Sequence, residues 1–199
     1  MTARELATGR GRPARRIELL GPMRVTVGGD EVEVRGTRRR AVLALLALQA
    51  GHVVATDAFL DAVWGAGPPP SGRHAVMSLM SRLRGDLGGS RAGIEQVGGG
   101  YRLVPSSWEV DVAEVRGQLR RAREVLASDA SAAADELSSA LVRWRGPALE
   151  EFASMGPLAA QGVALGELRM TIEEELIAAR LDGGEGADLV EASFQAVLA

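Results

Sequence analysis

The 199-residue sequence predicts an α+β domain of about 90 residues followed by an all-α domain. Short apolar strands and helices succeed one another in residues 16–105, after which the composition shifts to Ala, Glu and Leu at helical spacing. The charge divides at the same place. Residues 1–105 hold 15 Arg and 9 Asp plus Glu, a balance of +6, whereas residues 106–199 hold 8 and 17, a balance of −9. A basic half joined to an acidic half predicts a nucleic-acid reader joined to a different module.

Composition excludes several protein classes. The chain has no cysteine, so it has no disulfide or thiolate metal site, and we expect a cytoplasmic, nucleoid-associated protein. No apolar run approaches the roughly 20 residues of a membrane span. Residues 1–15 lack the apolar core of a signal peptide and are expected to form a flexible basic arm. All 23 cations are arginine, which we attribute to GC-rich coding rather than to phosphate recognition.

The first elements of the α+β domain are predicted to be strands and a buried helix. Residues 16–34 indicate three short strands, RIELLG, MRVTV and EVEV, separated by glycine-containing breaks. Thr37 is expected to cap a helix that ends at Gly51, and its apolar residues surround it almost completely, as in a central helix. Arg38, Arg39 and Arg40 lie in its first turn, where cations oppose the helix dipole. A nearby phosphate would relieve that conflict, although three solvated arginines would cost little.

A second helix and a long loop precede the most informative segment. Thr56 and Asp57 are an N-cap pair for a short helix, and the proline-rich stretch 65–72 then forms a stiff loop. The helix after it, within 73–87, has one apolar face made of Val76, Leu79, Met80, Leu83 and Leu87. His74, Ser78 and Ser81 lie on the opposite face, with Met77 beside them. Arginines flank this polar face, with Arg73 and Arg84 on one side and Arg82 on the other.

That layout suits a helix in a DNA major groove. Short side chains reach base edges while arginines grip the phosphates on either side. Residues 94–104 then indicate a β-hairpin with Gly98, Gly99 and Gly100 at its tip, and the order of helix and hairpin predicts a winged helix-turn-helix. A solvated helix face is the simpler interpretation of the arginines alone.

The acidic half predicts helices at 111–127, 132–144, 157–181 and 187–198, with Asp111 and Asp129 as start signals. Paired antiparallel helices of this length are typical of tetratricopeptide-like packing, although the strict repeat is absent. The last helix reaches the final residue without a stop signal. We therefore expect either a truncated domain or a short one.

Several segments, taken in order, resemble a known family. LGP at 20–22, GTRRRAVLALLAL, TDAFLDAVWG, SRLRGDLG and GGGYRLV are similar to the OmpR-type (OmpR/PhoB-like) winged helix of the Streptomyces antibiotic regulatory protein (SARP) family. ALVRWRGPALEEF and LGELRMTIEEELIAARL resemble the bacterial transcriptional activator domain that follows it there. The resemblance covers about residues 16–198.

The resemblance implies a transcriptional activator of a secondary-metabolite or antibiotic gene cluster. Such proteins bind direct repeats in promoters as side-by-side pairs, a homodimer on DNA, and recruit RNA polymerase, which the loop 65–72 can face. Carried over by position, Arg82 and Arg84 would contact DNA from the helix and Arg102 from the wing. The chain departs from the family at Leu79, where histidine is common, and at HAVM in 74–77, so its operator should differ.

The expected DNA interface unites these observations. Its residues are Arg38, Arg40, Arg73, His74, Met77, Ser78, Ser81, Arg82, Arg84, Gly99, Tyr101 and Arg102.

Two other functions compete with DNA binding. In the first, the acidic helical half is a protein-interaction module and the winged helix serves docking. In the second the chain is an enzyme, but its two histidines, His52 and His74, belong to no nucleophile, metal-ligand or phosphate-loop pattern. The run at 173–175 is most simply a solvated acidic face. We expect no enzyme activity, no cofactor and no metal.

Overall fold

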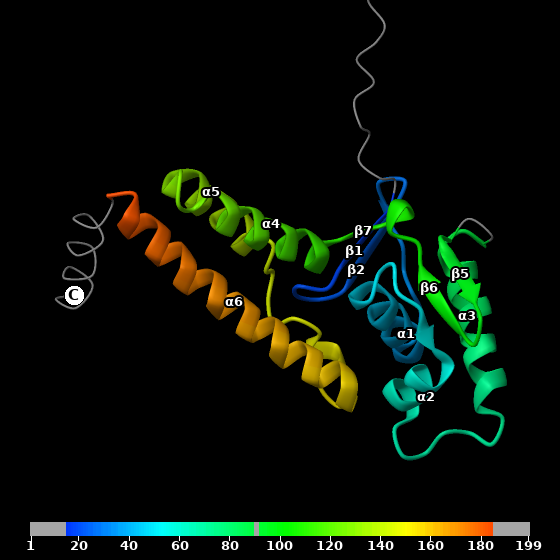
Figure 1. Cartoon of the computed structure of the whole chain (residues 1–199). Helices are drawn as coiled ribbons and strands as arrows, with labels where there is room; N and C mark the ends of the chain where they lie inside the picture. The colour runs from blue at the N-terminus through cyan, green and yellow to red at the C-terminus, as the bar shows by residue number, and fades with distance from the viewer. Residues whose placement is uncertain (1–14, 90–91, 185–199) are drawn as a thin grey trace, which may run out of the picture. The chain divides into compact units, whose positions relative to one another are not determined.

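The computed structural model describes residues 15–89 and 92–184 (Figure 1). They fall into two compact units, one containing residues 15–18 and 23–110 and the other residues 19–22 and 111–184. The units divide between Val110 and Asp111, a few residues beyond the expected position, because residues 109–110 still pair with the first strand. The expected basic arm and the expected helix 187–198 lie outside the described residues, the arm except for its last residue.

The first unit begins with a four-stranded sheet in the order β3-β2-β1-β7. β1 (Arg15–Glu18) runs antiparallel to β2 (Arg24–Val27) and parallel to β7 (Glu109–Val110). β3 (Asp30–Glu31) is shorter than the predicted EVEV strand. Ile17 lies opposite both Val25 and Val110, and all three side chains are buried, so this face of the sheet belongs to the core.

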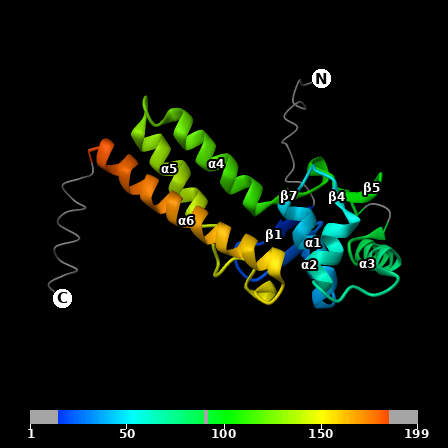
Figure 2. The ribbon, with the colours of Figure 1, turned by 60° about the horizontal axis from the view of Figure 1, so that its bottom comes forward.

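Three helices complete the core of the first unit: α1 (Thr37–Leu48), α2 (Thr56–Trp64) and α3 (Gly72–Asp86). α1 packs against both of the others (Figure 2). Every residue from 41 to 47 is buried, which confirms the prediction of a central helix.

Both expected threonine caps are wrong. The N-cap of α1 is Gly36, which has φ +81°, and its carbonyl accepts the N–H groups of Arg39 and Arg40. Thr37 is therefore already inside the helix. The N-cap of α2 is Ala55, because the Thr56 hydroxyl donates instead to the carbonyl of Gly99 at 2.6 Å.

A second sheet carries the hairpin. Its order is β4-β6-β5, with β4 (Val54–Ala55), β5 (Ile94–Val97) and β6 (Gly100–Leu103), and both pairings are antiparallel. Gly98 and Gly99 form the two-residue turn, and Gly98 has φ +55° at the first turn position, where a type II′ turn needs glycine. The predicted hairpin and its glycine tip are confirmed.

The second unit is a set of antiparallel helices: α4 (Asp111–Val125), α5 (Ala130–Leu141) and α6 (Gly156–Asp182), with a short 3-10 turn at Glu150–Phe152. α5 packs against both α4 and α6. The Asp129 carboxylate accepts the N–H of Ala132 at 2.9 Å, which confirms this residue as the start signal of α5. α6 buries every seventh residue, namely Leu158, Leu165, Ile172 and Ala179.

Asp111 does more than begin a helix. Its carboxylate is buried and accepts the backbone N–H groups of Leu19, Leu20 and Val112 at 2.8 to 3.0 Å. The same short segment, residues 19–22, is held by Arg145, whose backbone N–H donates to Leu20 and whose guanidinium donates to Pro22. Residues 19–22 therefore belong to the helical unit although strands of the first unit flank them in sequence.

Candidate nucleic-acid interface

Helix α3 has the two faces that its sequence predicts. Val76, Met80 and Leu83 are at most 1% exposed and face the core, and Leu87, just after the helix, is also buried. Leu79 is only half-buried, so it lies at the edge of the apolar face rather than within it. The core thus fixes which face of α3 is available to a ligand.

The opposite face of α3 presents three polar side chains and one methionine. His74 and Ser81 are exposed, Met77 is 53% exposed, and Ser78 is half-buried. Arg73 and Arg82 are exposed on the two sides of this strip. Within the described residues neither arginine has a hydrogen bond or ion pair, so both can meet an anion. We name the set 73, 74, 77, 78, 81 and 82 the polar strip.

Arg84 behaves differently from Arg82, although both belong to the SRLR sequence. It is half-buried, its Nη2 donates to the carbonyl of Ile94 at 3.0 Å, and its guanidinium lies 5.7 Å from the centre of the Tyr101 ring. Both partners are in the hairpin. The structure thus turns this arginine inward, where the helical pattern placed it on a flank of the exposed face.

The hairpin is attached to the helical core at its tip. Gly99 is exposed as predicted, but its carbonyl accepts two hydrogen bonds from Thr56, one from the backbone N–H at 3.1 Å and one from the hydroxyl at 2.6 Å. Tyr101 differs from the expected surface residue. Its ring is only 4% exposed and packs edge-on against Phe59, with centroids 6.1 Å apart. The ring therefore serves the core.

Arg102 remains on the open side of the hairpin. It lies directly opposite Glu95 across the β5–β6 ladder, and its Nη2 donates to that carboxylate at 2.6 Å. The side chains are 38% and 49% exposed, so the pair is accessible to a ligand. Sequence reasoning did not identify Glu95. Its pairing with Arg102 follows from hairpin register, because two residues separate each of them from the Gly98–Gly99 turn.

The first turn of α1 holds three arginines with three different partners. Arg38 is exposed and stacks over the Trp64 ring at 5.4 Å. Arg39 forms a half-buried ion pair with Asp86 of α3 at 2.8 Å. Arg40 donates to the carbonyl of Met23 at 3.1 Å. These contacts replace the simple solvation that the sequence allowed, and of the three only Arg38 is exposed.

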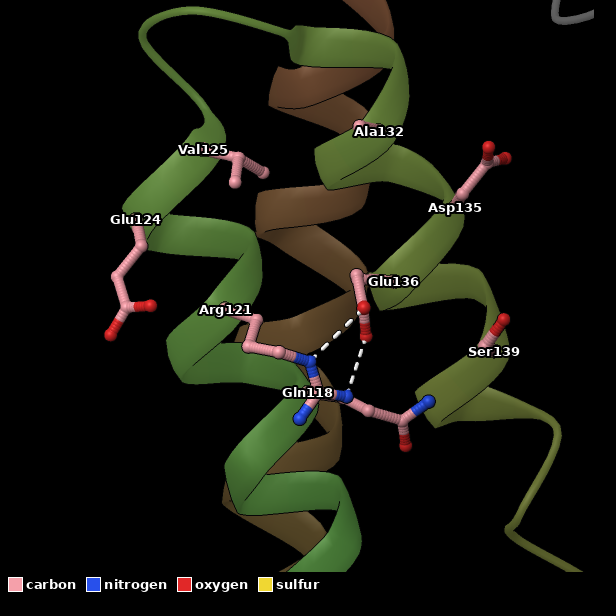
Figure 3. Close-up of a pocket in the computed structure, with 8 residues that line it drawn as sticks. All are labelled: Gln118, Arg121, Glu124, Val125, Ala132, Asp135, Glu136 and Ser139. Carbon is pink, nitrogen blue, oxygen red and sulfur yellow. Dashed lines mark hydrogen bonds and ion pairs between the residues drawn. The ribbon is translucent and has the colours of Figure 1, made fainter. Parts of the chain in front are cut away.

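The second unit offers a groove between α4 and α5 (Figure 3). Arg121 and Glu136 cross it with two hydrogen bonds, 3.1 and 2.9 Å long. The hydrogen bond from Arg121 lowers the pKa of the Glu136 carboxyl, while burial opposes the shift. Glu124 and Asp135 point away from one another, so their charges do not converge on a ligand.

In residues 15–89 and 92–184 no group of three acidic or histidine side chains could hold a metal, and no helix combines the length and hydrophobicity of a membrane span.

Two family profiles match the chain. The transcriptional regulatory protein C-terminal domain matches residues 29–103, and the bacterial transcriptional activator domain matches residues 110–199. Fold and profiles together define a transcriptional regulator with an OmpR-type DNA-binding domain.

Similar proteins identify the family. RedD of Streptomyces coelicolor is 31% identical over 85% of this chain and 50% of its own length. MoaR1 of Mycobacterium tuberculosis is 31% identical over 91% of this chain and 60% of its own length. The chain belongs to the Streptomyces antibiotic regulatory protein family of transcriptional regulators.

A solved structure gives the same answer for the fold. Mycobacterium tuberculosis EmbR, in complex with a low-affinity phosphopeptide, superposes with a TM-score of 0.82 at 29% identity. The match covers 94% of this chain and 50% of the EmbR chain. The chain thus spans between about a fifth and three fifths of the length of the relatives it matches, from 18% of AfsR of Streptomyces coelicolor to 60% of MoaR1.

Proposed function

We propose that the chain binds promoter DNA specifically, with α3 in the major groove and the β5–β6 hairpin against the neighbouring phosphates. The polar strip is the observation that carries this proposal. Exposed short side chains between two exposed arginines can reach base edges while the arginines meet phosphates on either side. Arg102 and Gly99 add a contact from the hairpin, and Arg38 adds one from the first turn of α1.

The helical unit supplies the rest of the proposed activity. We infer that two copies bind direct repeats side by side and recruit RNA polymerase, and that the regulated promoters belong to a secondary-metabolite gene cluster. The charge balance of −9 in residues 106–199 supports a protein partner rather than DNA for this unit. The proline-rich loop between α2 and α3, residues 65–71, projects from the first unit and suits a polymerase contact (Figure 1).

Footprinting on the promoters beside the gene tests the proposal, because it reports the site and the repeat spacing together. Arg82→Ala should weaken specific binding by about 1–3 kcal/mol and lower the slope of log affinity against log salt by about 0.9 if one phosphate contact is lost. Arg116→Ala, an exposed arginine of α4, removes the same charge from the helical unit and should bind like the unchanged protein. Wild-type binding by Arg82→Ala and Arg102→Ala would refute the assignment, and sequence-blind binding would favour the docking alternative.

A further inference from the structure

Arg82 and Arg84 lie two residues apart on α3 and have opposite surroundings. Arg82 is exposed, and within the described residues it has no hydrogen bond or ion pair. The guanidinium of Arg84 is held between the backbone of β5, at Ile94, and the ring of Tyr101 on β6. An arginine in that position has used its planar face and one donor within the protein.

The Ile94 carbonyl oxygen depends on Arg84 for its hydrogen bond. The N–H of Val104 donates to the carbonyl of Gly93 at 2.9 Å, and carbonyls of successive residues on a strand point in opposite directions. The carbonyl of Ile94 therefore points away from β6. Because β5 is the edge strand of its sheet, no other strand in the described part of the chain satisfies that carbonyl, and Arg84 does so from α3.

Tyr101 also links Arg84 to helix α2. The face of Tyr101 that meets Arg84 belongs to a ring packed edge-on against Phe59, which is fully buried. Arg84 therefore joins the recognition helix to both strands of the hairpin, and through Tyr101 to the second helix. Lysine could not reproduce this arrangement, because its ammonium has no planar face to stack on a ring.

We propose that Arg84 is a positioning residue that sets the hairpin relative to the recognition helix, and that it does not bind a phosphate. The inference rests on the proposed DNA-binding function. It replaces the role that family resemblance implies for this residue, and it leaves Arg82 as the DNA contact of the SRLR sequence.

Hydrogen exchange of the free full-length protein tests the positioning role without DNA. Arg84→Met keeps the length and apolar contact of the side chain but removes its donors, and Arg82→Met is the matched control. We expect amide exchange across 94–103 to become about tenfold faster in Arg84→Met and to stay unchanged in Arg82→Met. Unchanged exchange in Arg84→Met would overturn the inference. If that variant is unfolded at the assay temperature, Arg84→Lys takes its place with the same expected result.

Measuring DNA binding of variants that also carry Arg102→Ala tests the role of Arg84 separately from the proposed DNA-binding function. With the charged contact of the hairpin already removed, Arg84→Met should leave the salt slope unchanged, whereas Arg82→Met should still lower it by about 0.9. A slope lowered equally by Arg84→Met would show a direct phosphate contact and overturn the inference alone. If Arg82→Met and Arg102→Ala both bind like the unchanged protein, the proposed function fails, while the exchange result still decides the role of Arg84.

Discussion

At the scale of single residues, the open side of the hairpin carries one ion pair, between Arg102 and Glu95. Arg102 points to the open side of the hairpin but shares its charge with Glu95, its direct cross-strand neighbour. A carboxylate at this position repels an approaching phosphate and holds the guanidinium to itself. In the proposed complex, Glu95 would therefore limit how strongly the hairpin holds DNA of any sequence.

Glu95→Gln should strengthen DNA binding. The substitution removes one negative charge and releases Arg102, so we expect about threefold tighter binding and a steeper salt dependence. Fluorescence anisotropy titrations at several salt concentrations measure both quantities. Glu33→Gln is the control, since Glu33 pairs with Arg35 at 3.4 Å and both side chains are exposed. Weaker binding by Glu95→Gln would mean that the ion pair orients Arg102 for its contact.

Single residues also show the limits of sequence reasoning. The two faces of α3 were predictable, because helical period is a local property and the apolar residues Val76, Met80 and Leu83 define it. The difference between Arg82 and Arg84 was not. It depends on a hairpin that begins ten residues later and folds back over one of the two arginines. The burial of Tyr101 has the same origin, because Phe59 reaches it from another helix.

At the scale of elements, two neighbouring contacts, with β4 and with the start of α2, hold the tip of the hairpin. Gly100 lies opposite Ala55 in the β4–β6 ladder, so close that a Cβ there would clash with the carbonyl oxygen of Val54. Thr56 then binds the next carbonyl, that of Gly99, with its backbone and its hydroxyl. Sequence predicted the glycine tip, but its attachment to the start of α2 depends on residues 43 positions apart. That long-range contact also accounts for the wrong cap at Thr56.

Gly100→Ala should therefore destabilise the first unit. The added methyl group would force β4 away from β6, and we expect a loss of about 2 kcal/mol in the free energy of unfolding. Urea unfolding followed by circular dichroism measures the loss. Gly99→Ala is the matched control, because nothing lies within 4 Å of a Cβ at Gly99 and its φ is not positive. Equal stability of the two variants would contradict this account of the hairpin.

At the scale of the whole molecule, the division into units does not follow the order of the chain. Residues 19–22 separate β1 from β2, yet they belong to the helical unit. The sequence there, LLGP, predicted only the end of a strand and a turn. The segment belongs to the helical unit because Asp111 and Arg145, about 90 and 125 residues further along the chain, form hydrogen bonds with its backbone groups.

Asp111→Asn should weaken the helical unit more than its conservative size suggests. The carboxylate accepts three backbone N–H groups and begins α4, where the helix dipole favours a negative charge. An amide cannot present two acceptor oxygens, so at least one buried N–H loses its partner. We expect a loss of about 3 kcal/mol in the free energy of unfolding, measured by urea titration. Asp135→Asn, an exposed residue of α5, should leave the transition unchanged. If both substitutions cost the same, residues 19–22 are held by Arg145 and by packing, and the buried carboxylate is not what joins this segment to the helices.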